Sequence, residues 1–378
     1  MKNLLTTEQS AGRKRFHAFA AEAIRPRAAE ADARQAVSRD VVKALAAEGL
    51  LSAMIPGPGG DPALDPLEYG LLTEEIGWAC QNVRNFVAVS DMVAHSVWRW
   101  GTEAQRARWL GPIAAGEVIA AFALTEPGTG SDAKNIATTA EAAGDEIVLR
   151  GRKKWISFGA IADVFLVFAQ YDGKHTAFLV ERDAPGLDIS PIGDLLGLRG
   201  SLLAELAFTD CRIPAANMVG GPGTGLAFVG SSALDVGRYS TAWGSVGLAR
   251  ACAEDSAAYA TRRLQGGGPI RDHQLVQAML TDMHVNTTAA RLLCYRAGLA
   301  RAARDPEAVN QTLAAKYFAS TTAMRAATDA VQIHGAAGIG SEAAVQRYLR
   351  DAKVMEIIEG TSQLLQSILG AAATGAGL

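Results

Sequence analysis

One acidic side chain stands where the sequence turns from one helical pattern into the next. The segment VMEIIEGTSQLLQ, residues 354–366, places Glu359 after two isoleucines and before Gly360. Glycine favours the end of a helix, and a hydroxyl at Thr361 or Ser362 can cap the next helix. A carboxylate at such a junction can project into a cleft, where apolar neighbours desolvate it and raise its pKa until it can accept a proton. The alternative is an exposed acid at a helix end, like Glu356.

Two earlier stretches carry groups that could hold a polar or flat ligand. AFALTEPGTGSD, residues 121–132, is rich in glycine and hydroxyls, and its exposed backbone N–H groups could hold a phosphate or the polar edge of a ring. It lacks the lysine of a P-loop and belongs to no βαβ unit, so it could also be a plain turn. KKWISFG, residues 153–159, places Trp155 and Ser157 on one face of an expected strand. An indole and a hydroxyl there could flank a flat cofactor, although Trp155 could also be core.

The composition excludes several classes of function. The 378 residues carry 36 basic and 39 acidic side chains, a net charge of −3, mixed along the chain without a basic stripe. Neither nucleic acid nor a membrane surface is therefore an expected partner. The N-terminus is polar and no apolar run approaches the roughly 20 residues that cross a bilayer, so we expect a cytoplasmic protein. The four cysteines stand singly and the histidines lack metal-ligand spacing, which predicts neither a disulfide nor a metal site.

The hydrophobic periodicity divides the chain into three parts. Residues 1–118 follow a helical period, with Asp65, Pro66 and Glu68 forming a helix start. Residues 119–228 alternate in short runs, as in DVFLVFAQ and HTAFLVE across a YDGK turn. Residues 229–378 return to long helical segments. We expect an α+β fold with an N-terminal helical domain, a central antiparallel β domain and a C-terminal four-helix bundle.

Taken in order, these stretches resemble a known enzyme family. Together with GLRGSLLAELAFTDCRIPAANMVG (197–220), DVGR (235–238), DAVQIHGAAG (329–338) and IIEGTSQ (357–363), they are similar to the acyl-CoA dehydrogenase family of flavoenzymes, from about residue 5 to residue 370. The resemblance implies the same three domains, a homotetramer or homodimer, and one FAD per chain. It also implies an acyl thioester substrate on CoA or acyl carrier protein, and an electron acceptor such as an electron-transfer flavoprotein.

The resemblance also assigns residues to FAD. Arg263 and Gln274 match residues that reach the FAD of a neighbouring subunit, and Ser157 stands where most members have threonine. Members of the family usually have an aromatic residue where Gly266 stands, so we expect this chain to bind the adenine end of FAD more weakly. The other expected FAD contacts are Phe122, Leu124, Thr125, Gly130, Ser131, Trp155, Ile156, Gln332, Gly335, Ala336, Thr361 and Gln363.

The reaction implied by the resemblance places Glu359 as the catalytic base. Some branches of the family carry the base before the arginine of DVGR, but that place is Gly237 here. The base would take the α-proton of the thioester while the β-hydrogen leaves as hydride to the flavin. Substrate contacts are expected from Arg84, Ser131, Asp235, Arg238 and Gly360; Asp235 and Arg238 could instead form an ion pair along a helix.

The sequence is compatible with several acyl groups on the substrate thioester. Gln81, Asn82, Arg84 and Asn85 stand where fatty-acyl members carry small or apolar residues. This variant resembles a branch of polyketide and nonribosomal peptide pathways that oxidises small polar acyl groups on acyl carrier protein, such as hydroxymalonyl. The alternatives are a catabolic short-chain acyl-CoA dehydrogenase, an oxidase that uses O₂, and a non-catalytic subunit. Arg84 could also be a structural ion-pair residue that points away from the pocket.

Overall fold

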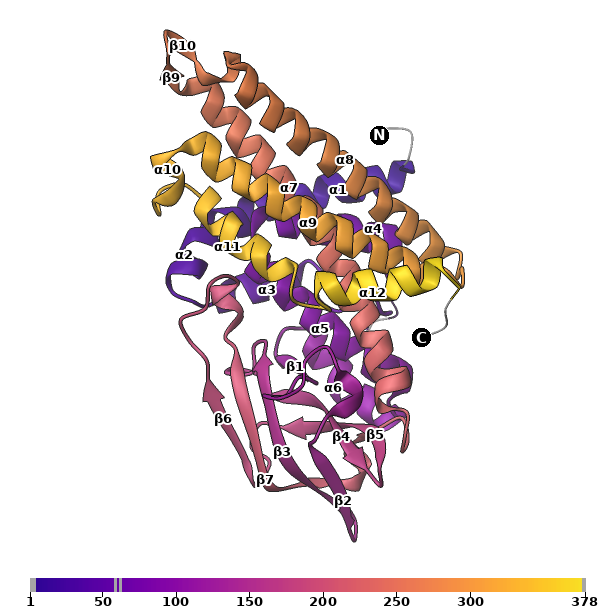
Figure 1. Ribbon diagram of the computed structural model, residues 1–378. Coiled ribbons are helices and arrows are strands. Elements are labelled where there is room, and N and C mark those ends of the chain that lie inside the picture. The colour runs from indigo at the N-terminus through magenta and orange to yellow at the C-terminus, as the bar shows by residue number, and fades with distance from the viewer. Residues whose placement is uncertain (1–4, 58–59, 61–62, 376–378) are drawn as a thin grey trace.

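The chain folds as helices at one end of an elongated molecule and a sheet at the other (Figure 1). The computed structural model describes residues 5–57, 60 and 63–375. The first and last thirds of the chain share the helical end, and the middle third forms the sheet. The expected order of helix, sheet and helix is confirmed. The two chain ends and part of the loop before Asp65 lie outside the described residues.

The N-terminal part is built around two buried helices, α4 and α5. Asp65 caps α4 as expected, because its Oδ1 accepts the N–H groups of Leu67 at 2.7 Å and Glu68 at 3.0 Å, and Pro66 is the first helical residue. An extended Cys80 separates α4 from α5. The elements are α1 (Thr7–Phe19), a π turn (Ala20–Ile24), a 3₁₀ turn (Arg25–Arg27), α2 (Ala28–Ala33), α3 (Arg39–Ala47), α4 (Pro66–Ala79), α5 (Gln81–Trp100) and α6 (Glu103–Ala114).

The β domain is one sheet in the order β6-β7-β3-β2-β4-β5-β8, with β1 pairing to β4. The sheet is not purely antiparallel as expected, because β4 pairs in parallel with β1 and β2. Longer crossover segments instead of hairpins lead from both strands to β4, as a parallel pair requires. The expected hairpin between β4 and β5 is present, and Asp172 (φ 49°) and Gly173 (φ 68°) have the positive φ that a tight hairpin turn needs. The strands are β1 (Ala120–Ala123), β2 (Thr139–Ala143), β3 (Glu146–Ile156), β4 (Val164–Tyr171), β5 (Lys174–Glu181), β6 (Leu187–Pro191), β7 (Ala204–Pro214) and β8 (Met218–Val219).

The C-terminal part is a helical bundle around the long helix α7. Gly247 lets α7 approach α4, since a Cβ atom there would stand 2.1 Å from the Glu74 carbonyl oxygen. A hairpin of β9 (Leu264–Gln265) and β10 (Gly268–Pro269) joins α7 to α8. No helix in the described parts of the chain is both long and apolar enough to cross a bilayer. The helices are α7 (Ser231–Arg262), α8 (Gln274–Ala302), α9 (Ala308–His334), α10 (Ala336–Ile339), α11 (Val345–Met355) and α12 (Ser362–Ala373).

Buried ion pairs join the N-terminal helices to the bundle. Glu74 on α4 lies 2.7 Å from Arg291 of α8, 3.2 Å from Arg250 of α7 and 3.3 Å from Arg13 of α1. The next residue, Glu75, also pairs with Arg250 and Arg13. Burial opposes ionisation of Glu74, but the guanidinium groups outweigh it and hold its pKa below its ordinary value. This charge cluster therefore connects four helices.

We expect Glu74→Gln to lower the free energy of unfolding by about 3 kcal/mol or more, because buried guanidinium groups lose their charge partner. Thermal unfolding followed by circular dichroism measures the change. The control is Glu30→Gln, whose partner Arg34 lies 3.0 Å away with both side chains mostly exposed. That variant should change stability by less than about 1 kcal/mol. Equal losses in the two variants would contradict a stabilising role for the buried cluster.

Candidate functional site

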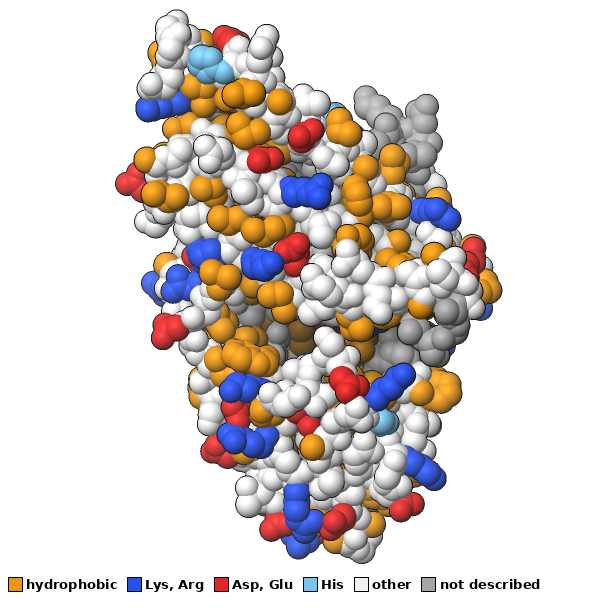
Figure 2. Space-filling view, viewed as in Figure 1, with side chains coloured by type: hydrophobic (Ala, Val, Ile, Leu, Met, Phe, Trp, Pro, Cys, Tyr) orange, Lys and Arg blue, Asp and Glu red, His pale blue; other side chains and the backbone are white. Residues whose placement is uncertain are grey.

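A cleft of about 390 Å³ opens where the β domain meets the helices. Figure 2 shows this side of the molecule hollowed between the sheet and α12. Its walls come from α5, the ends of β1 and β3, α7 and the junction of α11 with α12. Segments far apart in the sequence meet here, and many of the residues singled out above line it: Phe122, Leu124, Thr125, Gly130, Ser131, Trp155, Ile156, Ser157, Arg238, Glu359, Gly360 and Thr361.

Glu359 enters the cleft from a tight turn between helices. Both Glu359 (φ 57°) and Gly360 (φ 94°) lie in the left-handed region, which is costly for a residue with a side chain. The helix before the turn ends at Met355, earlier than the glycine suggested. Thr361 caps the following helix as expected, with its Oγ1 accepting the Leu364 N–H at 3.2 Å. The turn therefore directs the carboxylate away from both helix axes.

The Glu359 carboxylate is buried and poised to accept a proton. Its Oε2 has no hydrogen-bond partner within the described parts of the chain. Burial raises the pKa of Glu359 above its ordinary value, and the charges of Arg238, Arg84 and Lys316 offset part of that rise. A desolvated carboxylate with a free oxygen is suited to general base catalysis.

The two charged residues of the DVGR motif have separate partners. Arg238 donates from Nε to the Glu359 carbonyl oxygen at 3.1 Å, so it supports the turn. Asp235 pairs with Arg301 of α8 at 2.6 Å and does not line the cleft. Within the described residues the two side chains form no ion pair with each other. The helix ion pair considered from the sequence is therefore wrong.

A buried pair that the sequence reasoning missed holds the cleft's two loops together. Lys153 donates to the Glu126 carboxylate at 2.7 Å and to the Leu124 carbonyl at 3.0 Å. Glu126 also accepts the N–H groups of Ala137 at 2.6 Å and Thr138 at 3.0 Å. Lys153 is fully buried, so it fixes the glycine-rich loop against β3. In the sequence Lys153 stands between Arg152 and Lys154, and only the two-residue period that places it on the inward face of the strand with Leu149 could have signalled this contact.

The strand period does not explain how Trp155 and Ser157 reach the same cleft. The pairing of β3 with β7 shifts register between Lys153 and Ile156, and Trp155 has a φ of 61°. Ser157 follows the last residue of the strand. Both residues line the cleft, and Trp155 is 52% exposed, so its indole is not a core side chain. Asn85 of α5 contacts the Ser157 hydroxyl, with its Nδ2 at 3.4 Å from Oγ.

Six of the residues assigned to FAD lie outside this cleft within one chain. Arg263 and Gln274 are exposed near the β9–β10 hairpin, and Gln332 and Gly335 are exposed at the end of α9. Ala336 lines a separate hollow of about 590 Å³ between the end of α7 and α10–α11. Gln363 of α12 is also exposed and is absent from the cleft wall. A single chain therefore does not bring the whole assigned set together.

Arg84 is buried behind the cleft wall without an ion pair. It is 1% exposed, and among the described residues no carboxylate lies within 4 Å of its guanidinium. Its nitrogens contact Gln81 at 3.1 Å, Thr241 at 3.3 Å and the Met355 sulfur at 3.4 Å. Burial lowers the pKa of Arg84 to about 10, although the nearby Glu359 charge opposes this. A structural ion pair is thus not what holds Arg84.

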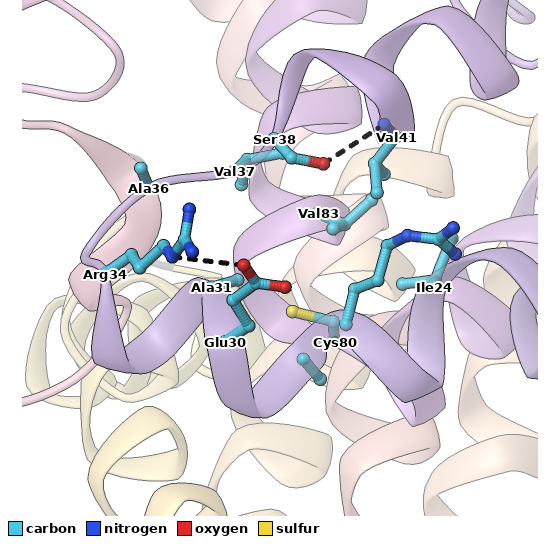
Figure 3. Close-up of a pocket in the computed structure, with 12 residues that line it drawn as sticks. Ile24, Glu30, Ala31, Arg34, Ala36, Val37, Ser38, Val41, Cys80 and Val83 are labelled. Atoms are coloured by element: carbon cyan, nitrogen blue, oxygen red, sulfur yellow. Dashed lines mark hydrogen bonds and ion pairs between the residues drawn. The ribbon is translucent and has the colours of Figure 1, made fainter.

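A smaller cavity of about 140 Å³ lies among α2, α3 and the start of α5 (Figure 3). Its polar groups already have partners: Ser38 caps α3 at the Val41 N–H, and Arg34 pairs with Glu30 at 3.0 Å. Burial raises the pKa of the Cys80 thiol, which makes it a weak nucleophile. This cavity therefore offers no reactive group comparable to Glu359.

Comparison with known proteins agrees with the site's geometry. Three family models match: acyl-CoA dehydrogenase N-terminal domain over residues 6–117, middle domain over 121–211 and C-terminal domain over 223–374. The chain is 38% identical to the probable acyl-CoA dehydrogenase YngJ of Bacillus subtilis, over 97% of each chain. It is 35% identical to the human mitochondrial short-chain specific acyl-CoA dehydrogenase, over 93% of this chain and 86% of that one.

Solved structures with the same fold include enzymes with different acyl groups. A glutaryl-CoA dehydrogenase from Mycobacterium smegmatis in complex with FADH2 superposes with a TM-score of 0.94, at 29% identity over 99% of this chain and 96% of that one. FkbI, for biosynthesis of a methoxymalonyl extender unit, gives 0.86 at 32% identity over 96% and 99%. The prolyl acyl carrier protein oxidase AnaB gives 0.90 at 28% over 99% and 100%.

The Glu359 carboxylate packs against Gly237 of α7, and a substitution at this glycine tests the contact. A Cβ atom there would stand 2.5 Å from Glu359 Oε2 and 2.8 Å from the Met92 sulfur. Both atoms lie near the ends of flexible side chains that can move, so we expect Gly237→Ala to lower the free energy of unfolding by only about 1 kcal/mol. The matched control, Gly370→Ala on α12, meets no atom within 4 Å and should be neutral or stabilising. Equal melting temperatures would contradict this packing.

Proposed function

The chain belongs to the acyl-CoA dehydrogenase family, and we propose that it dehydrogenates a small polar acyl thioester with Glu359 as the base. Membership makes it an FAD-dependent oxidoreductase that acts on acyl thioesters. The observation that carries the assignment of the base is the buried Glu359 carboxylate, which faces the cleft with a free oxygen. Of the described acids, Glu359 is the one that lines this cleft.

The residues of the cleft fit a flavin. The half-exposed indole of Trp155 offers an apolar face, and a Cβ atom at Gly130 would meet no atom within 4 Å, so the loop leaves space for a ligand. The hydroxyls of Thr125, Ser157 and Thr361 open onto the same space. Bound FAD supplies the acceptor for the substrate hydride. The residues that would hold it are Phe122, Leu124, Thr125, Gly130, Ser131, Trp155, Ile156, Ser157 and Thr361.

The remaining FAD contacts support an assembly of identical chains. Arg263 and Gln274 are exposed and lie away from the cleft, so they suit the FAD of a neighbouring subunit, and Gln332, Gly335 and Ala336 suit the dinucleotide that a neighbour extends. Apolar side chains also lie exposed along α8, where Val285, Leu292 and Leu299 recur every seven residues (Figure 2). A second copy of the chain would cover this stripe. A homotetramer or homodimer is the assembly we infer.

In the proposed reaction the protein moves one proton and holds the substrate. Glu359 takes the α-proton of the thioester, and its raised pKa brings its basicity closer to that of a weak carbon acid. The family resemblance gives the backbone N–H of Glu359 the role of a donor to the thioester oxygen, which stabilises the developing negative charge. Arg238 holds the same turn through the Glu359 carbonyl. An electron-transfer flavoprotein is the acceptor we infer for the electrons.

Glu359→Gln is expected to keep FAD and the fold while slowing flavin reduction by about 10² to 10⁴ or more, because it removes a positioned base with little change in volume. Anaerobic mixing with an acyl thioester, followed through flavin absorbance, measures the rate. Glu356→Gln is the control, since that acid pairs with Lys353 at 2.9 Å and does not line the cleft. Wild-type rates in the Glu359 variant would rule out the assignment.

The polar residues near the start of α5 favour a small polar acyl group. Gln81, Asn82, Arg84 and Asn85 are all buried there, and Asn85 lines the cleft. Arg84 has no carboxylate of the protein to pair with, so a substrate carboxylate could supply two parallel charge-assisted hydrogen bonds. An alkyl chain offers no such partner. The similarity to FkbI and AnaB supports an acyl carrier protein as the carrier of the acyl group.

Two other functions have specific support. The 35% identity to a short-chain specific enzyme favours a catabolic short-chain acyl-CoA dehydrogenase equally well. The similarity to AnaB, an acyl carrier protein oxidase, favours an enzyme that passes its electrons to O₂. The same anaerobic mixing separates these candidates when CoA and carrier-protein thioesters are compared and oxygen is then admitted.

Arg84→Met tests the choice of acyl group, because methionine keeps most of the volume and removes the charge. We expect a loss of about 30-fold to several thousand-fold in kcat/KM for a hydroxymalonyl thioester, which corresponds to roughly 2 to 5 kcal/mol. A butyryl thioester should lose little or improve, since it leaves the arginine without a partner in the wild type. Equal losses for both thioesters would assign Arg84 a structural role and favour the short-chain enzyme.

A further inference from the structure

Lys316 is a buried ammonium that the reaction described above does not use. It lies on α9 with no exposed surface, and it is absent from the cleft wall. Its Nζ donates to the carbonyl oxygen of Gly360 at 2.6 Å. Among the described residues no carboxylate lies within 4 Å of Nζ. Burying an ammonium without an ion pair costs free energy, which suggests that Lys316 has a role at the Glu359–Gly360 turn.

Two cationic side chains hold successive carbonyls of that turn. Arg238 of α7 donates to the Glu359 carbonyl at 3.1 Å, and Lys316 of α9 donates to the Gly360 carbonyl at 2.6 Å. Both turn residues have positive φ, a conformation that Glu359 adopts only when its surroundings enforce it. Hydrogen bonds from charged donors are stronger than neutral ones. The pair therefore fixes the backbone that aims the Glu359 side chain.

The charges around Glu359 come from three helices. Arg84 of α5, Arg238 of α7 and Lys316 of α9 each lower the pKa of the Glu359 carboxyl, against a larger rise from burial. Burial lowers the pKa of Lys316 to about 8; the negative charges of Glu359 and Glu356 oppose this, and the positive charges of Arg238 and Arg84 add to it. Lys316 thus titrates closer to neutral pH than Arg84, whose pKa burial lowers only to about 10.

We propose that Lys316 is a positioning residue for the catalytic base: its ammonium fixes the Glu359–Gly360 turn and keeps the Glu359 carboxylate ionised until substrate arrives. The proposal rests on Glu359 being the base and adds a residue from outside the cleft. Because Lys316 does not touch the space for substrate, it acts on the rate constant and on its dependence on pH, and it has little effect on KM.

Lys316→Met removes the charge and the hydrogen bond. Flavin reduction needs ionised Glu359, so kcat/KM falls as the pH drops through the pKa of that carboxyl. Loss of a nearby positive charge raises this pKa, and the acidic limb of the pH profile should move up by about one pH unit. At neutral pH we expect kcat to fall about 10-fold or more with KM nearly unchanged. FAD content, read from absorbance, should stay at the wild-type level.

Three further variants separate charge from structure. Lys316→Arg keeps the charge and should keep the acidic limb close to the wild-type position, while Lys316→Gln keeps a donor without charge and should move it as Lys316→Met does. Lys353→Met removes a half-exposed lysine that pairs with Glu356 on the surface, and it should leave the limb in place. A wild-type limb in Lys316→Met or Lys316→Gln, or loss of folding in both, overturns the proposal.

The Glu359→Gln variant distinguishes failure of the assigned base from failure of the Lys316 proposal alone. If that variant reduces flavin at the wild-type rate, the assignment of the base fails, and the Lys316 proposal fails with it. If Glu359→Gln is inactive but either neutral Lys316 variant keeps the wild-type limb, the base stands and Lys316 is a structural residue of α9.

Discussion

Helix α7 packs against both the N-terminal helices and the Glu359 turn, and three glycines allow this close approach. Glycines at 237, 244 and 247 lie on one side of this helix, and a Cβ atom at each would stand within 2.7 Å of an atom of Glu359, Arg84 or the α4 backbone. A side chain at position 247 would push α7 away from the α4 backbone, and one at position 237 would displace the Glu359 carboxylate. The same helix face therefore serves both packing and the site.

Close packing around α7 both buries the Glu359 carboxylate and brings cationic side chains near it. A base for a weak carbon acid must be desolvated, yet a buried carboxyl group far from any positive charge tends to stay protonated. Burial and the nearby cations Arg238, Arg84 and Lys316 act on Glu359 in opposite directions. For Glu74, in the helical end of the molecule, the guanidinium groups outweigh burial and lower the pKa, so this carboxylate stays ionised. The two acids differ because Glu74 has direct ion pairs and Glu359 keeps a free oxygen.

The two sides of the cleft are built from different elements and present different groups. The β-domain side is held rigidly by the buried Lys153–Glu126 pair and offers exposed hydroxyls and an indole. The helical side carries Glu359 on a turn held by hydrogen bonds to its carbonyls, and behind it lie the polar residues of α5. Because different elements form the two sides, substitutions on α5 can alter the helical side without disturbing the hydroxyls and the indole of the β-domain side.

Periodicity and capping signals lie in contiguous segments, so they predicted the order of the three parts, the caps at Asp65 and Thr361 and the β4–β5 hairpin. The family resemblance implied most of the residues that line the cleft. No local pattern indicates the parallel pairings of β4, the register shift beside Trp155 or the partner of Asp235, nor that Arg84 has no ion pair among the described residues. Only the tertiary structure shows that Lys316 reaches Gly360. These features join residues distant in sequence, and burial and charge at such contacts depend on how whole elements pack.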